Sequence, residues 1–478
     1  MRVLMFSLFI ILAACNNETA EVEAAASATA SKKQEQGAVA LRVSNALKKA
    51  DDFKHLNAFI TIDPQDATNR ALALDNQQQE KGPLHGMLLA VKDNIHVAGL
   101  ANTAGTPGLK GFIPDTDNEV IKRLKDAGAI VLGKANMHEL AFGITSENAA
   151  FGAVRNPSDQ NKFAGGSSGG TAAAIAAGLV DAGLGTDTGG SVRIPAALTG
   201  IAGFRPSSGR YPIGDVTPVS SSRDIIGPIA TSVTDLIRLD SAITLDTTPV
   251  SAADLNSLRL GVDRGYYFSN LDPDVEQCAN EALAILAQAG VTIVPMPVPQ
   301  LAELLAKSGF PIALYEAVHE LPPYLKKFKT GVTFTELVAQ IASPDVQGVF
   351  AAATTNETAI SESVYQAALQ AKQALTDNFA AYYAQHTLDA MVFPTTKLPA
   401  RDIEGSADTV ALNGEQVPTF PSYIHNTDPA TIAKLPAISL PLNKCSSSMP
   451  VGLELDGPHE SDRTLLGIAL AVERILSK

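Results

Sequence analysis

The chain alternates between stretches with the helical spacing of apolar residues and short apolar runs that are typical of buried strands. Near residue 117 a polar start is followed by apolar residues that share one face of a predicted helix. These residues are Val120, Ile121 and Leu124. Gly128 ends this helix, and the apolar residues 129–132 follow it as a predicted strand.

The same order recurs further along the chain. Asp272 and Pro273 begin a predicted helix that Gly290 ends, and 291–294 follow as a strand. Further strands are expected at 259–262, 390–393, 437–440 and 452–455, and a closing amphipathic helix at 462–475. This alternation favours an α/β fold in which helices cover a central sheet. No repeat of fixed period and no linker interrupts residues 39–478, so one large domain is expected there.

Composition and charge narrow the function classes. The chain has 478 residues, 45% hydrophobic and 18% charged, which is typical of a globular protein with a large core. Its net charge of −14 argues against nucleic-acid binding, which needs a basic surface. Cys278 and Cys445 have no spacing that suggests pairing, so two free thiols are expected. No group of Cys and His residues has metal-ligand spacing in the sequence.

Residues 1–15 have the pattern of a secretory signal. Arg2 supplies a positive start, and residues 3–12 form an apolar run too short to span a hydrocarbon core of ~30 Å. The ending Leu-Ala-Ala-Cys resembles a bacterial lipoprotein signal, in which cleavage precedes Cys15 and that residue carries lipid. The alternative is an ordinary signal peptide in which Cys15 is incidental.

Residues 16–38 are rich in Ala, Ser, Glu and Lys and contain almost no large apolar side chain. Such a segment buries too little surface to offset its ordering entropy, so a flexible tether is expected. Asn16 and Asn17 follow the cysteine, and this resembles outer-membrane sorting in a Gram-negative cell. The expected location is therefore the periplasmic face of the outer membrane, with the membrane contacted through lipid on Cys15.

Two loops rich in glycine and serine, at 165–170 and 187–191, flank a stretch of small residues at 171–179. Small side chains all round suit a helix that packs closely against other backbone. A phosphate-binding loop would end in Gly-Lys-Ser or Gly-Lys-Thr, and neither loop contains that lysine. A structural alternative is that the glycines only form tight turns. Two such loops, each with a serine, favour catalysis instead.

The second loop has the composition of a site for nucleophilic catalysis. A serine such as Ser191 is a weak nucleophile and needs a base. Consecutive glycines allow backbone N–H groups to converge on one point, so an oxyanion hole is expected beside Ser191. Its expected donors are Thr188, Gly189 and Gly190, together with Ser191 itself. Asp187 and Arg193 flank the loop, and a charge-assisted hydrogen bond between them is expected to stiffen it.

The pattern alone leaves two candidates for the base. His138 would suit a Ser-His pair, but a lone histidine next to a glutamate is more often structural. Lys92 ends an apolar run at 88–91, where a partly desolvated lysine can lose its proton near neutral pH. A solvated lysine after a strand is the competing interpretation, and spacing alone does not decide between them.

The two loops are parts of longer motifs. These are GGSSGG at 165–170, GTDTGGSVRIPA at 185–196 and GFRPSSGRYP at 203–212. Together with Val-Lys-Asp-Asn at 91–94, they resemble the amidase signature family, and the similarity extends from about residue 56 to residue 453. The resemblance implies one large domain with a central mixed sheet covered by helices on both faces.

The same resemblance implies an amidase mechanism that needs no metal or cofactor. Ser191 matches the nucleophile, Ser167 matches a relay serine that follows a cis peptide bond, and Lys92 matches the base. Ser168 matches a serine that positions Lys92. An acyl-enzyme forms and is then hydrolysed by water.

Shorter motifs are similar to the branch of indoleacetamide and mandelamide hydrolases. They lie at 136–140, 142–146, 152–157 and 209–212. Members of that branch cleave primary amides of aryl-bearing acids, so a small-molecule amide is the expected partner. Residues 300–430, where the family builds much of its substrate pocket, show no comparable match.

Three other functions fit parts of the sequence. A fatty-acid or peptide-amide hydrolase of the same family would differ only in its substrate. The glutaminase subunit of a tRNA-dependent amidotransferase works in the cytoplasm, and the N-terminal signal disfavours it. A binding lipoprotein on an inactive amidase scaffold is disfavoured because all three catalytic positions are occupied as in the active family.

Overall fold

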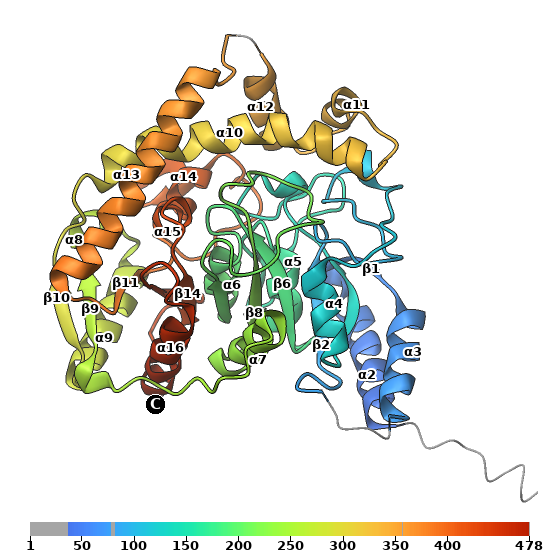
Figure 1. The fold of residues 1–478 in the computed structure, drawn as a ribbon, viewed down its shortest axis with the longest axis horizontal. Coiled ribbons are helices and arrows are strands. Elements are labelled where there is room, and N and C mark those ends of the chain that lie inside the picture. The colour runs from blue at the N-terminus through green and yellow to red at the C-terminus, as the bar shows by residue number, and fades with distance from the viewer. Residues whose placement is uncertain (1–36, 78–81, 356, 478) are drawn as a thin grey trace, which may run out of the picture.

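The computed structural model describes residues 37–77, 82–355 and 357–477. A central sheet of 11 strands has the order β1-β3-β2-β6-β8-β7-β14-β15-β11-β9-β10 (Figure 1). Its strands are β1 (Phe59–Ile62), β2 (Leu88–Lys92), β3 (Ile130–Ala135), β6 (Ala182–Asp187), β7 (Ala202–Arg205), β8 (Ile225–Ala230), β9 (Arg259–Val262), β10 (Thr292–Pro295), β11 (Ala390–Pro394), β14 (Ala437–Pro441) and β15 (Gly452–Asp456). Two small hairpins pair β4 (Arg155–Asn156) with β5 (Asp159–Phe163), and β12 (Thr409–Leu412) with β13 (Glu415–Pro418). The predicted signal with Cys15, and the predicted tether up to residue 36, lie outside the described residues.

The central sheet is mixed. β2 pairs in parallel with β3 and β6, and β9 pairs in parallel with β10 and β11. Between these two parallel sets, β8, β7, β14 and β15 continue the sheet through antiparallel pairs. The expected α/β fold with a central mixed sheet is thereby confirmed.

Helices cover both faces of the sheet. Their bounds are α2 (Ala38–Asp52), α3 (Pro64–Asp75), α4 (Glu119–Asp126), α5 (Gly169–Ala176), α6 (Arg193–Thr199), α7 (Val233–Thr244), α8 (Arg264–Tyr267), α9 (Pro273–Gln288), α10 (Leu301–Lys327), α11 (Phe334–Ala339), α12 (Pro344–Thr354), α13 (Glu362–His386), α14 (Thr419–Ile424), α15 (Asp428–Ile432) and α16 (Asp462–Leu476). Side chains alternate along β2, so Leu89 and Val91 lie on the face of the sheet whose apolar cluster also includes residues of α4, α7, α9 and α16. Leu88 and Ala90 pack on the opposite face with α2, α3 and α5.

The elements predicted from apolar spacing are present. The strands expected at 259–262, 390–393, 437–440 and 452–455 correspond to β9, β11, β14 and β15. Asn118 caps α4 by accepting a hydrogen bond from the Val120 N–H, and Asp272 caps α9 through Asp274 N–H, with Pro273 at the first helical position. These capping contacts explain why polar residues before an apolar run marked the helix starts.

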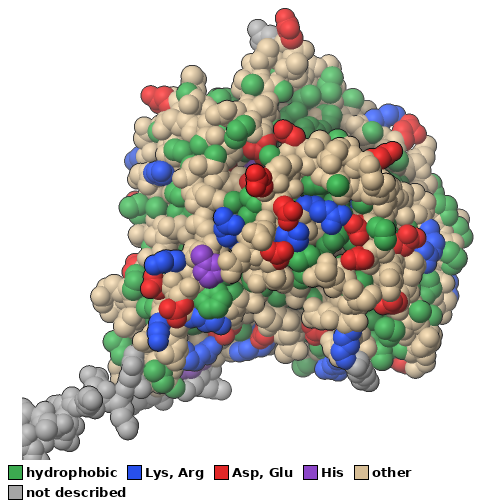
Figure 2. All heavy atoms as spheres, turned by 180° about the vertical axis from the view of Figure 1, so that it is seen from behind, with side chains coloured by type: hydrophobic (Ala, Val, Ile, Leu, Met, Phe, Trp, Pro, Cys, Tyr) green, Lys and Arg blue, Asp and Glu red, His purple; other side chains and the backbone are tan. Residues whose placement is uncertain are grey.

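A separate helical layer lies above the strand ends at the top of Figure 1, where α10 crosses the sheet and α13 descends beside it. α10 and α13 pack against each other, and α12 also contacts α10. Among the described residues, no helix has both the length and the apolar character that crossing a membrane requires. Acidic and basic side chains are interspersed over the face shown in Figure 2.

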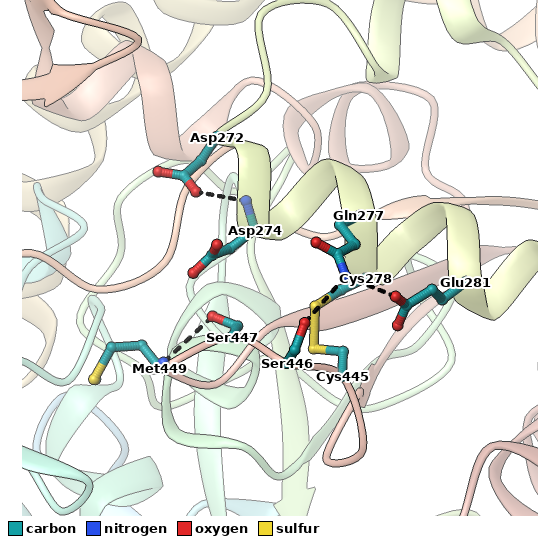
Figure 3. Close-up of a disulfide and its surroundings, with 9 residues drawn as sticks. All are labelled: Asp272, Asp274, Gln277, Cys278, Glu281, Cys445, Ser446, Ser447 and Met449. Atoms are coloured by element: carbon teal, nitrogen blue, oxygen red, sulfur yellow. Dashed lines mark hydrogen bonds between the residues drawn. A yellow bond between two sulfur atoms is a disulfide. The ribbon is translucent and has the colours of Figure 1, made fainter.

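The expectation of two free thiols is wrong, because Cys278 and Cys445 form a disulfide (Figure 3). Cys278 lies on α9, and Cys445 lies in the turn between β14 and β15, with the two Cα atoms 5.2 Å apart. Gln277, next to Cys278, donates a hydrogen bond to Ser446 Oγ at 3.1 Å and so joins the same two segments. The pairing could not be predicted from the sequence, because 167 positions separate the two cysteines. Only the packing of α9 against the sheet brings them within the distance that a disulfide requires.

Candidate active site

Lys92 is the last residue of β2, and its side chain is completely buried. Its Nζ lies 2.7 Å from Ser167 Oγ and 2.8 Å from Thr186 Oγ1, so it meets two hydroxyl groups rather than a carboxylate. Burial lowers the pKa of Lys92 to about 7, although the charges of Asp187 and Asp224 act in the opposite direction. A neutral amine beside a serine hydroxyl can accept its proton.

The first glycine-serine loop connects β5 to α5. The Gly166–Ser167 peptide bond is cis, as the family resemblance implies for Ser167. α5 carries only small residues on its first turns because it packs against backbone. A Cβ added to Gly170 would lie 2.3 Å from the carbonyl oxygen of Asn136. The loop can therefore present Ser167 to Lys92 while its helix lies directly on the neighbouring chain.

The second loop connects β6 to α6 and is shaped by the Asp187 carboxylate. Asp187 accepts hydrogen bonds from Gly190 N–H at 2.8 Å and Val192 N–H at 3.3 Å, which fold the loop around it. Gly190 has a φ of +137°, and a Cβ there would lie 2.1 Å from Thr427 Oγ1. A side chain at this position is excluded by both the backbone conformation and the neighbouring threonine.

The loop geometry corrects one part of the expected oxyanion hole. Because the Gly190 N–H donates to Asp187, it is not free to bind a developing oxyanion. The main-chain N–H groups of Thr188, Gly189 and Ser191 remain as candidates. The Asp187 carboxylate therefore occupies the Gly190 N–H, which the glycine run had suggested as a donor to the oxyanion.

Ser191 lies where the two loops meet. The Ser168 N–H donates to the Ser191 carbonyl oxygen at 3.2 Å, which joins the loops through their backbones. Ser168 Oγ donates to the Thr186 carbonyl oxygen at 3.3 Å, the same oxygen that Lys92 Nζ approaches at 3.4 Å. Ser168 and Lys92 therefore share a neighbour in Thr186, and no hydrogen bond joins them directly among the described residues.

Asp187 and Arg193 form the expected hydrogen bond, and they are the centre of a larger buried cluster. Arg193 Nε lies 3.0 Å from Asp187, and its Nη1 lies 2.5 Å from Glu454 on β15. Arg205 on β7 donates to the Asp187 carbonyl oxygen at 2.6 Å and to its carboxylate at 3.0 Å. Burial alone would raise the pKa of Asp187, but the two arginines hold it well below its usual range.

The loop 219–224 also supports the second glycine-serine loop, and sequence reasoning missed it. Thr188 Oγ1 donates to Asp224 at 2.5 Å, and Arg223 Nε donates to the Thr188 carbonyl oxygen at 3.0 Å. The available signal was a polar run, Ser-Ser-Ser-Arg-Asp, immediately before the apolar strand β8. Nothing in that run indicates that β8 pairs with β6 and brings Asp224 under Thr188.

His138 is placed away from the role of a base. Its Nε2 lies 2.8 Å from Asp345 Oδ2, and its Nδ1 accepts a hydrogen bond from the Ser146 N–H at 3.2 Å. Both ring nitrogens are therefore engaged, one with the first turn of α12 and the other with the backbone at Ser146. The structural interpretation of this histidine is the one that the contacts favour.

Ser191 lines a cavity of about 120 Å³. That is roughly ten times the volume that admits one water molecule. Most of the lining is apolar, and its larger apolar side chains include Phe142, Ile144, Phe310, Leu314, Phe420 and Ile424. Phe310 from α10 meets Phe420 from α14 edge to face, with ring centroids 5.8 Å apart. The arrangement places an apolar binding space directly beside a buried Ser-Lys constellation.

Comparisons with known proteins agree with this arrangement. The family model described as Amidase matches residues 42–466. An indoleacetamide hydrolase of Agrobacterium vitis is 40% identical over 436 residues, which cover 91% of this chain and 93% of the relative. A mandelamide hydrolase of Pseudomonas putida is 41% identical over 450 residues, covering 90% and 87%.

Solved structures give the same result. A crystal structure of an amidase has a TM-score of 0.80 at 32% identity and covers 91% of this chain and 96% of its own. The peptide amidase of Stenotrophomonas maltophilia has a TM-score of 0.79 at 28% identity, covering 92% and 94%. The chain therefore belongs to the amidase family, and it is a hydrolase that acts on carbon–nitrogen bonds in linear amides.

Proposed function

We propose that this amidase converts the primary amide of an aryl-bearing carboxylic acid to the acid and ammonia. The observation that carries the proposal is the apolar, phenylalanine-lined cavity that opens on Ser191. Relatives about 40% identical over most of the chain are named for indoleacetamide and mandelamide, both primary amides with an aromatic ring. An aromatic acid group in this cavity would place its amide carbon beside the second glycine-serine loop.

The proposed first step is attack of Ser191 Oγ on the amide carbon. The Ser191 proton passes to Ser167 Oγ as the Ser167 proton passes to Lys92 Nζ, which lies 2.7 Å away. This transfer requires Lys92 to be neutral, and burial supports that by lowering its pKa to about 7. The N–H groups of Thr188, Gly189 and Ser191 are the proposed donors to the oxyanion.

The relay then runs in reverse. Lys92 returns a proton through Ser167 to the leaving nitrogen, the carbon–nitrogen bond breaks, and ammonia leaves an acyl group on Ser191. A water molecule next gives a proton to the same relay and attacks the acyl carbon. Collapse of the second tetrahedral intermediate releases the acid and restores the Ser191 hydroxyl.

Ammonia release from a panel of amides tests the substrate class. The panel contains phenylacetamide, indole-3-acetamide and mandelamide, together with hexanamide, a dipeptide amide and glutamine. We expect the highest kcat/KM among the three aromatic amides, and no release above background from Ser191→Ala. A clear preference for glutamine, the peptide amide or hexanamide would refute the proposed substrate class.

We further infer a location in the cell envelope, with the chain held by lipid on Cys15. The N-terminal pattern supports this proposal, because its short apolar run ends in Leu-Ala-Ala-Cys. The disulfide between Cys278 and Cys445 also supports it, since disulfides persist in oxidising compartments and are rare in the cytosol.

A further inference from the structure

Two charged side chains interrupt the apolar lining of the cavity beside Ser191. They are Arg223 and Asp428, which form an ion pair. A few polar groups in an apolar pocket usually fix the orientation of a ligand. Whether this ion pair can orient a substrate depends on which of its atoms are free to form a further hydrogen bond.

All three nitrogens of the Arg223 guanidinium donate hydrogen bonds to the protein. Its Nε donates to the Thr188 carbonyl oxygen at 3.0 Å, and its Nη1 donates to the Gly309 carbonyl oxygen on α10 at 2.6 Å. Its Nη2 donates to Asp428 Oδ1, and only 4% of the side chain is exposed. The guanidinium therefore clamps the pocket walls together and has little capacity left for a substrate.

Asp428 is engaged on one side only. Oδ1 pairs with Arg223, whereas Oδ2 accepts no hydrogen bond from any residue that the structure describes. The side chain is 20% exposed, and it borders the cavity. Gly309 on α10 has no side chain to obstruct Oδ2, whereas a Cβ at this position would lie only 3.0 Å from it.

The position of this free oxygen is fixed relative to the catalytic loop. Arg223 connects Asp428 to the Thr188 carbonyl oxygen. The preceding residue, Thr427, donates to the Gly189 carbonyl oxygen at 2.6 Å. Asp428 is therefore anchored, through Arg223 and through Thr427, to the segment that precedes Ser191. Its free oxygen can favour amides that place a hydrogen-bond donor against it.

We propose that Asp428 Oδ2 is a specificity-determining acceptor for a hydrogen-bond donor on the acid part of the substrate. This inference rests on the proposed aryl-amide function and refines it, because the preferred amides carry an O–H or a ring N–H in addition to the aromatic ring. A hydrogen bond to a carboxylate is stronger than one between neutral groups, and an amide without the donor leaves Oδ2 unpaired. Amides that carry a carboxylate on the acid part are disfavoured, because that carboxylate and Asp428 repel each other.

The test uses mandelamide and phenylacetamide, which differ by one hydroxyl group. Wild type is compared with Asp428→Asn, in which the amide oxygen keeps its place on Arg223 and an NH₂ replaces Oδ2. We expect the ratio of kcat/KM for mandelamide over phenylacetamide to fall about 10- to 100-fold, the effect of losing a hydrogen bond to a charged group. Indole-3-acetamide and its 1-methyl derivative repeat the comparison for a ring N–H; a fall confined to one pair identifies which donor Oδ2 accepts.

A second variant keeps the carboxylate and obstructs it. Gly309→Ala places a methyl group against Oδ2, and alanine favours the helical conformation of α10. The same ratio should fall. Asp402→Asn is the charge control, since its carboxylate is 64% exposed and pairs with Lys162 outside the cavity.

The outcomes separate this inference from the proposed function. If Asp428→Asn and Gly309→Ala lower both members of each pair equally, Asp428 only holds the pocket together and the inference is overturned. If wild type hydrolyses none of the four aromatic amides but does hydrolyse another amide, the proposed substrate class fails, and the inference fails with it.

Discussion

At the scale of single residues, the role proposed for Lys92 as the base depends on the environment of its amine. The strand β2 ends at Lys92 and buries its side chain completely, so the charged form of the amine is penalised. Asp187 and Asp224 limit this effect without reversing it, and the pKa settles at about 7. The amine is therefore able to change protonation state in the range where an enzyme operates.

A pH profile of kcat/KM tests this assignment. Below pH 7 Lys92 is protonated and cannot accept the Ser167 proton, so the rate should rise with pH and level off above an apparent pKa of about 7. Lys92→Ala should lower kcat/KM by ~10²–10⁴-fold, the typical contribution of a positioned base. Lys92→Arg, which stays charged, should be equally inactive. A flat profile between pH 5 and 9 would argue against Lys92 as the base.

The residues of the site differ in how far the sequence predicted their roles. Ser191 was recognisable from its loop, because consecutive glycines before a serine indicate convergent N–H groups. Lys92 was not, because a lysine at the end of an apolar run is equally compatible with solvent exposure. Arg223 and Asp428 were missed altogether, since their roles depend on contacts between segments about 200 positions apart.

At the scale of elements, the buried ionic cluster joins the catalytic loop to the sheet. Arg193 on α6 contacts Asp187 at the end of β6 and Glu454 on β15, and all three side chains are fully buried. These contacts fix where α6 begins. They therefore also fix the path of residues 188–192, which connect β6 to α6 and include Ser191. A buried pair of this kind is costly to break from one side.

Arg193→Ala should therefore destabilise the fold strongly. It leaves the buried Glu454 carboxylate without its basic partner and Asp187 with Arg205 alone, which costs about 3–5 kcal/mol in the free energy of unfolding. Urea unfolding followed by circular dichroism measures this change. Arg70→Ala is the matched control, because Arg70 pairs with Asp66 on the surface of α3 and should cost less than about 0.5 kcal/mol. A loss below about 1 kcal/mol for Arg193→Ala would contradict the role given to this cluster.

The elements differ in how far the sequence predicted them. Strands such as β9 and β14 were predictable because each is a short apolar run between turn residues. The long helix α10 was not, because Pro311, Pro322 and Pro323 lie within it and proline normally ends a helix. The disulfide was predicted wrongly, since its formation depends on the packing of α9 beneath the β14–β15 turn.

At the scale of the whole molecule, the mixed sheet brings distant segments to one place. Lys92 comes from β2, Ser191 follows β6, and the two strands are neighbours in the sheet. The helical layer of α10, α12 and α14 supplies much of the cavity wall above them. The proposed mechanism therefore assigns the chemistry to residues at the strand ends and the substrate selection to the helices that line the cavity.

The proposed envelope location is tested on the full-length chain in a bacterial host that processes lipoproteins. Lipid on Cys15 should place the protein in the membrane fraction, with a mass that includes the acyl groups. Cys15→Ser should move it to the soluble fraction without changing kcat/KM, because the N-terminal segment precedes the folded amidase. Unchanged membrane retention and unchanged mass in Cys15→Ser would overturn lipidation at this residue.

The most direct test of the proposed mechanism is to locate the acyl group during turnover. The p-nitrophenyl ester of phenylacetic acid should acylate the enzyme faster than water removes the acyl group, because p-nitrophenolate is a good leaving group. The reaction is stopped with acid during the burst of p-nitrophenolate, and the protein is analysed by intact mass and peptide mapping. We expect one phenylacetyl group per chain on Ser191 and none on Ser191→Ala. A phenylacetyl group on Ser167 or Lys92, or a full rate of ester cleavage by Ser191→Ala, would contradict the mechanism.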